Sequence, residues 1–253
     1  SMASAGLDMI NVSASYFTTQ QTDLAKIRSM VPDITVYFEM CHSIWNGEKM
    51  SAGYDVFPFR RTTSEQYFTT AHHAYSQGAD GVSLFNFAYY REHGGAGRGP
   101  FSEPPFDIIS RLCDREWLAT QPQHWFLAKG WDNACIRPPL MPRKVETGKA
   151  VKFELDLAPP VGGWVSGGRL RIQTDKVMEN RAWIARLNGV ELIATEDVSE
   201  PYANPYPAML GRPEMMKAWL IPSAVLHTGS NELSVTLSKG DPCSVAYLDL
   251  AVK

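Results

Sequence analysis

The sequence predicts an α/β part followed by an all-β part. Strand-like and helix-like runs alternate through about the first 120 residues, which is typical of βαβ units and a parallel sheet. Four prolines interrupt this pattern between residues 121 and 148. Short β-rich runs separated by turn signals fill the rest of the chain, as in an antiparallel β-sandwich or jelly roll. We therefore expect domains over 1–121 and 149–253, joined by a linker over 122–148.

Three strand-then-helix units make up the first part. Leu24, Ile27 and Met30 recur at helical spacing, and Gly78 stands where a glycine is expected to end a helix. The connections from helix to strand are short, which favours parallel strands with helices packed against the sheet. The expected strands cover 7–15, 34–41 and 81–87, and the expected helices cover 19–31, 64–77 and a segment ending near 119.

Turn signals divide the second part into strands. The pair Asn188-Gly189 lies between the runs AWIARL and VELIAT. It predicts a hairpin, because a two-residue type I′ turn needs positive φ at both central positions. The other expected strands are VKFELDL, RLRIQT, NELSVTL and VAYLDLAV.

Composition excludes several classes of protein. The formal charge is −3 and the sequence has no run rich in Lys and Arg, so we expect neither nucleic acid nor a membrane surface as partner. No apolar stretch is long enough to span a bilayer, since about 18 residues are needed. The four cysteines are widely spaced, which favours single buried thiols over a zinc site. No cofactor is expected, the one alternative being a structural calcium ion held by loop carboxylates such as Asp197 and Glu200.

Glu39 stands out in the first part. Its strand places Val36, Phe38 and Met40 on one face and Thr35, Tyr37, Glu39 and Cys41 on the other. The apolar face is expected to meet the helices, which directs Glu39 to the opposite face near the C-terminal end of the strand. Ligands bind at this end of parallel strands. The alternative is a purely structural glutamate paired with an arginine such as Arg60.

Aromatic residues are frequent in the loop that follows, over 42–63. Flat rings with an apolar face beside polar groups can hold sugar rings, although they can equally seal the mouth of a barrel. Further candidates for substrate contacts lie on inward strand positions or close to the strand ends. The substrate-binding set is Tyr16, Tyr37, His42, Trp45, Asn86 and His93.

The runs LDMINVSAS, ITVYFEMCHSIW and GADGVSLFNFAYYRE resemble the last strands of the (βα)8 barrels of glycoside-hydrolase-like proteins from polysaccharide-degrading bacteria. The resemblance covers about the first 120 residues and implies the last three βα units of a TIM-like barrel. It also implies that Glu39 matches the nucleophile at the end of the seventh strand. The runs RLNGVEL, WLIPSAVLHTGSNELSV and AYLDLAV are similar to the galactose-binding-like jelly rolls appended to many glycosidases.

One departure from that family affects the expected activity. Hydrolysis of a glycosidic bond needs two carboxyl groups, and the acid of the resembled barrels comes from a fourth strand that this chain lacks. Three strands also cannot close an eight-stranded barrel. We therefore expect that this chain is part of an O-glycosyl hydrolase acting on a poly- or oligosaccharide. Its partner would be the absent N-terminal part of the barrel or a second copy, and an unpaired strand edge is expected on the N-terminal side.

A second function is compatible with the same residues. The barrel can be degenerate, in a non-catalytic carbohydrate-binding or cell-surface protein whose jelly roll binds the ligand or acts as a structural module. Trp164, Tyr202 and Tyr206 are the binding candidates there, because they fall near turns or in a loop rich in Pro and Tyr. An extracellular or periplasmic location is expected if the parent protein degrades polysaccharide.

Overall fold

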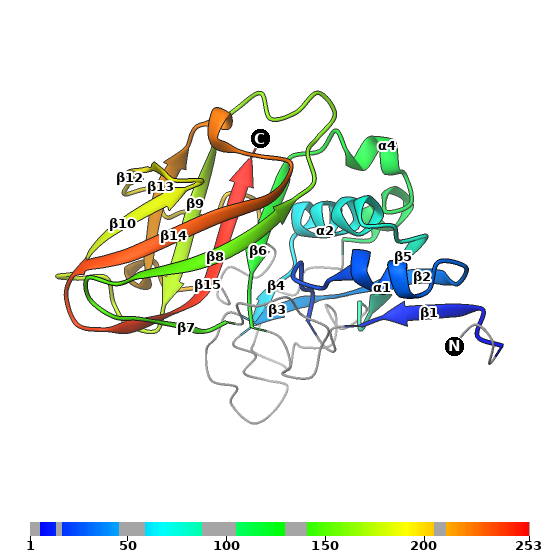
Figure 1. Cartoon of the computed structure of the whole chain (residues 1–253), viewed down its shortest axis with the longest axis horizontal. Helices are drawn as coiled ribbons and strands as arrows, with labels where there is room; N and C mark the ends of the chain where they lie inside the picture. The colour runs from blue at the N-terminus through cyan, green and yellow to red at the C-terminus, as the bar shows by residue number, and fades with distance from the viewer. Residues whose placement is uncertain are drawn as a thin grey trace.

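The computed structural model describes residues 6–13, 17–45, 59–87, 105–129, 141–204 and 211–252. Figure 1 shows a layered β-structure on one side and helices with a small sheet on the other. The chain is rich in strands, and most of its sheets are antiparallel. Among the described residues, no helix is both long and apolar enough to cross a bilayer.

The first part holds a parallel sheet of three strands in the order β1-β2-β5. In the described part of the chain β1 pairs with β2 alone and is an edge strand. A barrel is not seen in these three strands. The elements are β1 (Met9–Val12), α1 (Leu24–Met30), β2 (Thr35–Cys41), α2 (Ser64–Ser76), β5 (Gly81–Phe85), the 3-10 helix η2 (Phe106–Arg111) and α4 (Arg115–Leu118).

Local sequence signals define both ends of helix α2. Thr63 and Gln66 form a capping box at its start, which satisfies backbone N–H groups that have no partner within the helix. Gly78 follows the helix with a φ of 94°, a left-handed conformation that glycine adopts without strain. The predicted helix over 64–77 is confirmed to within a residue.

The apolar face of the parallel sheet packs against the helices, as predicted. Val36, Phe38 and Met40 share one buried cluster with Tyr67 and Ala71 of α2. Val82 and Leu84 of β5 pack against the same cluster. Ser83 therefore lies with Glu39 on the face away from the helices.

Two antiparallel sheets form the second part. One has the order β11-β10-β14-β8, and the other follows β12-β13-β9-β15-β6 with β7 also paired to β15. The first sheet consists of β8 (Ala150–Leu157), β10 (Ala182–Leu187), β11 (Val190–Glu191) and β14 (Gly229–Lys239). The second consists of β6 (Gln123–Leu127), β7 (Arg143–Val145), β9 (Gly168–Thr174), β12 (Ile193–Thr195), β13 (Met216–Ile221) and β15 (Cys243–Val252).

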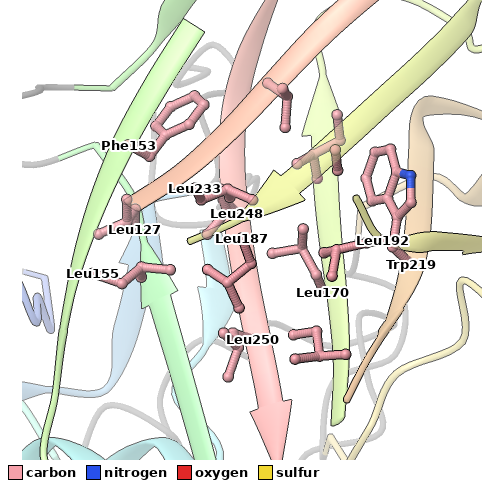
Figure 2. Packing of buried hydrophobic residues seen from close by; sticks show 14 of the residues in the cluster. Leu127, Phe153, Leu155, Leu170, Leu187, Leu192, Trp219, Leu233, Leu248 and Leu250 are labelled. Carbon is pink, nitrogen blue, oxygen red and sulfur yellow. The ribbon is translucent and has the colours of Figure 1, made fainter. Parts of the chain in front are cut away.

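Apolar side chains from both sheets meet in one core. Figure 2 shows Phe153 and Leu155 of β8 and Leu233 of β14 directed toward Leu248 and Leu250 of β15. Face-to-face sheets with a shared apolar layer form a β-sandwich. The finer assignment to a galactose-binding-like jelly roll remains a prediction.

The predicted hairpin at Asn188-Gly189 is confirmed. Leu187 pairs with Val190 across the turn. Asn188 and Gly189 have φ angles of 51° and 82°, the positive values that a type I′ turn requires at both positions.

Strand β6 differs from the linker predicted over 122–148. Gln123–Leu127 pairs with β15, and Trp125 and Leu127 belong to the sandwich core while Phe126 packs with Tyr247 on the other face. All five residues of β6 are buried, so the polar alternation that marks a half-exposed strand is absent. The change of sequence pattern at Pro122 therefore marks the start of a strand that is covered on both faces.

The segment 19–23 also differs from the predicted helix over 19–31, because α1 begins only at Leu24. Its polar side chains bond the free edge of β6. Gln20 Oε1 accepts from the Phe126 N–H at 2.8 Å, and Gln21 Oε1 accepts from the Ala128 N–H at 3.4 Å. Thr69 of α2 accepts from the His124 N–H at 2.8 Å. Side chains of the first part thus cover an edge that would otherwise expose unpaired backbone groups.

A short antiparallel hairpin lies within the predicted loop over 42–63. It is formed by β3 (Ser43–Trp45) and β4 (Phe59–Arg61). Ile44 packs with Phe126 and Tyr247 of the sandwich. The end of β2 therefore continues directly into a hairpin that rests on the second part.

Candidate functional site

Glu39 lies in the central strand of the parallel sheet, two residues before its C-terminal end. Its flanking residues Phe38 and Met40 are buried toward the helices, so the Glu39 side chain points to the opposite face. It is half-buried there. The predicted orientation of Glu39 agrees with this placement.

Two side chains donate hydrogen bonds to the Glu39 carboxylate, one from Asn11 in β1 and one from Ser13, which follows β1. Asn11 Nδ2 donates to Oε2 at 2.9 Å, and the Ser13 hydroxyl donates to Oε1. Ser83 of β5 donates to Asn11 Oδ1 at 2.9 Å, which fixes the direction of the Asn11 amide. Each carboxylate oxygen retains a lone pair, so the group is oriented without being fully enclosed.

The hydrogen bond between Ser83 and Asn11 also indicates how the Glu39 face of the parallel sheet is curved. Neighbouring strands lie about 4.8 Å apart, so β1 and β5, with β2 between them, are separated by roughly 10 Å. Two short side chains span that distance only when the sheet curves so that they converge above β2. The direct bond therefore indicates that the Glu39 face is the concave one.

Arg60 is not the partner of Glu39, which corrects the structural alternative considered above. Its guanidinium pairs with Glu200 of the sandwich and lies 4.7 Å from the centre of the Tyr247 ring. Residues 44 and 60 are paired across the hairpin, and both face the sandwich rather than the parallel sheet. The Glu39 carboxylate is held by neutral donors.

Tyr37 and Asn86 belong to the substrate-binding set. Tyr37 lies on the Glu39 face, one pleat toward the start of β2. Its ring covers Gly81, since a Cβ at residue 81 would lie 2.4 Å from Tyr37 Cε1. Asn86 follows β5 in a left-handed conformation with a φ of 53°, which asparagine tolerates better than most residues. Their contact with substrate remains a prediction.

His42 directly follows β2 but is buried, with 3% of its surface exposed. Its Nδ1 lies 3.1 Å from the Cys41 thiol. Burial raises the pKa of that thiol to about 11, although hydrogen bonds from Ser43 act in the other direction. The pair is therefore not an activated thiolate, because a thiol with a raised pKa stays protonated near neutral pH.

Trp45 ends β3 and has Phe17 and Lys129 as neighbours. Its ring contacts Phe17 at a centroid distance of 5.3 Å, and the Lys129 ammonium lies 4.1 Å from its centre. One face of the indole is thus covered by a cation, a favourable arrangement for tryptophan. Tyr16 and His93 lie outside the described residues, as do Tyr54 and Phe57 of the aromatic loop.

A buried charged network was missed by sequence reasoning. Arg171 of β9 donates to Asp249 of β15 from Nε at 3.0 Å and from Nη2 at 2.6 Å. Asp249 also accepts from Tyr247 and bonds His124 Nε2 at 3.1 Å. Burial alone would raise the pKa of Asp249, but the Arg171 charge and these hydrogen bonds outweigh it and hold the pKa well below its usual range. A usable signal existed, since Arg171 lies between the core residues Leu170 and Ile172, and Asp249 lies between the core residues Leu248 and Leu250.

Both carboxylates named for the calcium alternative are paired with arginines. Glu200 accepts from Arg171 Nη1 at 3.1 Å and pairs with Arg60. Asp197 accepts from Ser199 and pairs with Arg169. In the part of the chain that the structure describes, no group of three His, Cys, Asp or Glu residues is arranged to hold a metal.

The sandwich aromatics have structural contacts. Trp164 Nε1 donates to Gln123 Oε1 at 3.1 Å. The Tyr202 hydroxyl bonds the Val252 carbonyl at 3.1 Å, and its ring packs on His124. Both side chains are half-buried and bonded to the sandwich, and Tyr206 lies outside the described residues.

Comparison with known proteins gives only weak similarity. No family model and no curated protein matches the sequence. Among solved structures, a β-porphyranase of glycoside hydrolase family 86 from the human gut bacterium Bacteroides plebeius is 13% identical, with a TM-score of 0.33 over 52% of this chain and 20% of that one. Wild-type BuGH86 in complex with neoagarooctaose is 12% identical, with a TM-score of 0.31 over 44% of this chain and 17% of that one. This chain thus spans about a fifth of the length of either structure.

Proposed function

We propose that this chain forms part of the active site of an O-glycosyl hydrolase, with Glu39 as nucleophile or general base. One observation supports this most directly: a half-buried carboxylate near the C-terminal end of the central parallel strand, oriented by Asn11 and Ser13 on the face away from the helices. An ionised carboxylate in this position can attack an anomeric carbon or activate water.

The second carboxyl group is proposed to come from outside this chain. The hydrogen-bond partners of Glu39 among the described residues are an amide and a hydroxyl. A retaining enzyme needs its acid about 5 Å from the nucleophile, and an inverting enzyme about 6.5–9.5 Å from the base. We further propose that β1, β2 and β5 are strands of a (βα)8 barrel whose other strands supply that group. The concave curvature inferred from the Ser83–Asn11 bond supports this.

The test uses a leaving group that departs without protonation. Dinitrophenyl glycosides, as a panel of sugars in both anomeric forms, release a weakly basic phenolate and so need no acid catalyst. We expect the full chain to release dinitrophenolate from at least one of them, and Glu39→Gln to lower the rate by about 100-fold or more. Glu116→Gln is the matched control, because Glu116 is an exposed residue of α4 in the same part of the chain. Equal rates for wild type and Glu39→Gln would remove Glu39 from the mechanism.

Mass spectrometry separates the two roles of Glu39. A nucleophile forms a covalent glycosyl-enzyme, so a slowly turned-over fluoroglycoside should add the mass of one sugar to the peptide that contains Glu39. A general base gives hydrolysis without that adduct.

The non-catalytic alternative makes a different prediction. It requires saturable binding of an oligosaccharide by the full chain with no Glu39-dependent release from any member of the panel. The contacts of Trp164 and Tyr202 do not favour the sandwich as the binding surface.

A further inference from the structure

The outer face of one sandwich sheet holds a charged network with almost no access to solvent. Arg171 and Asp249 are both 0% exposed, and Glu200 is 15% exposed. Arg171 Nη1 also donates to the carbonyls of Val198 and Ser199, at 2.9 and 2.8 Å. A buried guanidinium with its donors bonded on a rigid sheet is a fixed point of the structure.

Glu200 joins this fixed point to the first part of the chain. Its carboxylate is shared between Arg171 and Arg60 of β4. The same loop contributes Asn204, whose Nδ2 donates to the Arg61 carbonyl at 3.3 Å. Strand β4 is therefore held by the sandwich through both a side chain and the backbone.

A short series of bonds connects β4 with the strand that bears Glu39. Thr62, which follows β4, donates from Oγ1 to the Cys41 carbonyl at 2.9 Å and from its N–H to the His42 carbonyl at 3.1 Å. Tyr67 donates to the same Cys41 carbonyl at 2.9 Å. Cys41 is two residues beyond Glu39, so these bonds connect β4 with the end of β2 where the carboxylate lies.

We propose that the β-sandwich helps to hold Glu39 in position and that Glu200 is a positioning residue for Glu39. The catalytic consequence rests on the function proposed above, whereas the structural coupling does not. Buried ion pairs often add little net stability compared with apolar residues. The ion pairs of Glu200 with Arg171 and Arg60 lie between a rigid sheet and the hairpin that continues β2. This location gives them a role in placing Glu39.

The test measures the coupling with and without catalysis. Wild type, Glu200→Gln and Arg60→Lys are compared by amide hydrogen exchange and by dinitrophenyl glycoside turnover per folded molecule. Arg60→Lys keeps a cation on β4 and guards against misfolding of the first variant. We expect exchange over residues 40–45 to rise about tenfold in both variants, since each loses a charged hydrogen bond. Turnover should fall by about 10- to 100-fold with little change in KM, as for a small misplacement of a catalytic group.

Asp80→Asn is the matched control. Asp80 pairs with Arg28 and accepts from the Val36 N–H at 2.8 Å, so it ties the opposite end of β2. This variant should leave exchange over 40–45 and turnover within about twofold of wild type. Unchanged exchange over 40–45 in both Glu200→Gln and Arg60→Lys would overturn the proposal. Faster exchange there in a chain without any turnover would support the coupling and refute the proposed hydrolase activity.

Discussion

Asp249→Asn tests whether the charged network contributes to stability as its geometry indicates. The wild-type carboxylate accepts two hydrogen bonds from Arg171, at 3.0 and 2.6 Å, and one from Tyr247 at 3.2 Å. Asparagine keeps one oxygen and places an NH₂ group against a donor. It also leaves the Arg171 charge buried with Glu200 as its one carboxylate partner.

The expected loss can be worked from these contacts. Hydrogen bonds to a charged group contribute about 1.5–3 kcal/mol each, and two of them involve Arg171. Both side chains are 0% exposed, so solvent screening does not reduce the value. We expect the free energy of unfolding to fall by about 3–5 kcal/mol, the range found when one partner of a buried ion pair is removed.

Urea unfolding measures this loss, with Glu232→Gln as the control. Glu232 pairs with Lys152 at 2.9 Å on the sandwich surface, where both side chains are more than half exposed. Its removal should cost less than about 1 kcal/mol. A loss for Asp249→Asn no greater than that of the control would refute the assigned role of the network.

The pH dependence gives a second readout of the same variant. The pKa of Asp249 is lowered in the folded state despite its burial, because of Arg171 and His124. A lowered carboxyl pKa contributes stability that is present above the unfolded pKa of about 3.9 and is lost as pH falls toward the folded value. The difference between wild type and Asp249→Asn should therefore be constant from pH 7 to 5 and narrow below about pH 4. A difference that widened with acid would contradict the sign of the shift.

Two further predictions concern the parallel sheet. Gly81→Ala should lower the free energy of unfolding by about 1–3 kcal/mol, because the new Cβ would lie 2.4 Å from the Tyr37 ring. In a double-mutant cycle with Tyr37→Ala the two losses should be clearly non-additive, and additive losses would disprove the contact. The Cys41 thiol, buried and with a pKa raised to about 11, should resist iodoacetamide at pH 8 in the folded chain while the exposed Cys113 reacts; equal labelling of both by mass spectrometry would contradict this burial.

Periodicity predicted the elements whose faces differ in polarity. The alternation in β2 indicated the direction of Glu39, and the helix over 64–77 agrees with α2. Segments buried on both faces gave no such signal, so β6 fell within the predicted linker. The polar residues of 19–23 were assigned to a helix, because nothing in their own spacing shows that Gln20 and Gln21 bond the edge of β6.

The sequence did not predict which charged residues pair with one another. Arg60 was considered as a partner of Glu39, yet it pairs with Glu200, which is 140 residues away. The bond from Asn11 to the Glu39 carboxylate depends on the pairing of β1 with β2.

The sequence by itself determined which residues of β2 turn toward an apolar core and where the hairpin at Asn188-Gly189 forms. These properties depend on neighbouring residues along one strand or turn, and the hydrophobic effect acts on each of them locally. The tertiary structure alone decided which buried polar groups meet. A buried charge must find a partner of opposite sign, and that partner is set by how distant strands stack, as Glu200 between Arg60 and Arg171 illustrates.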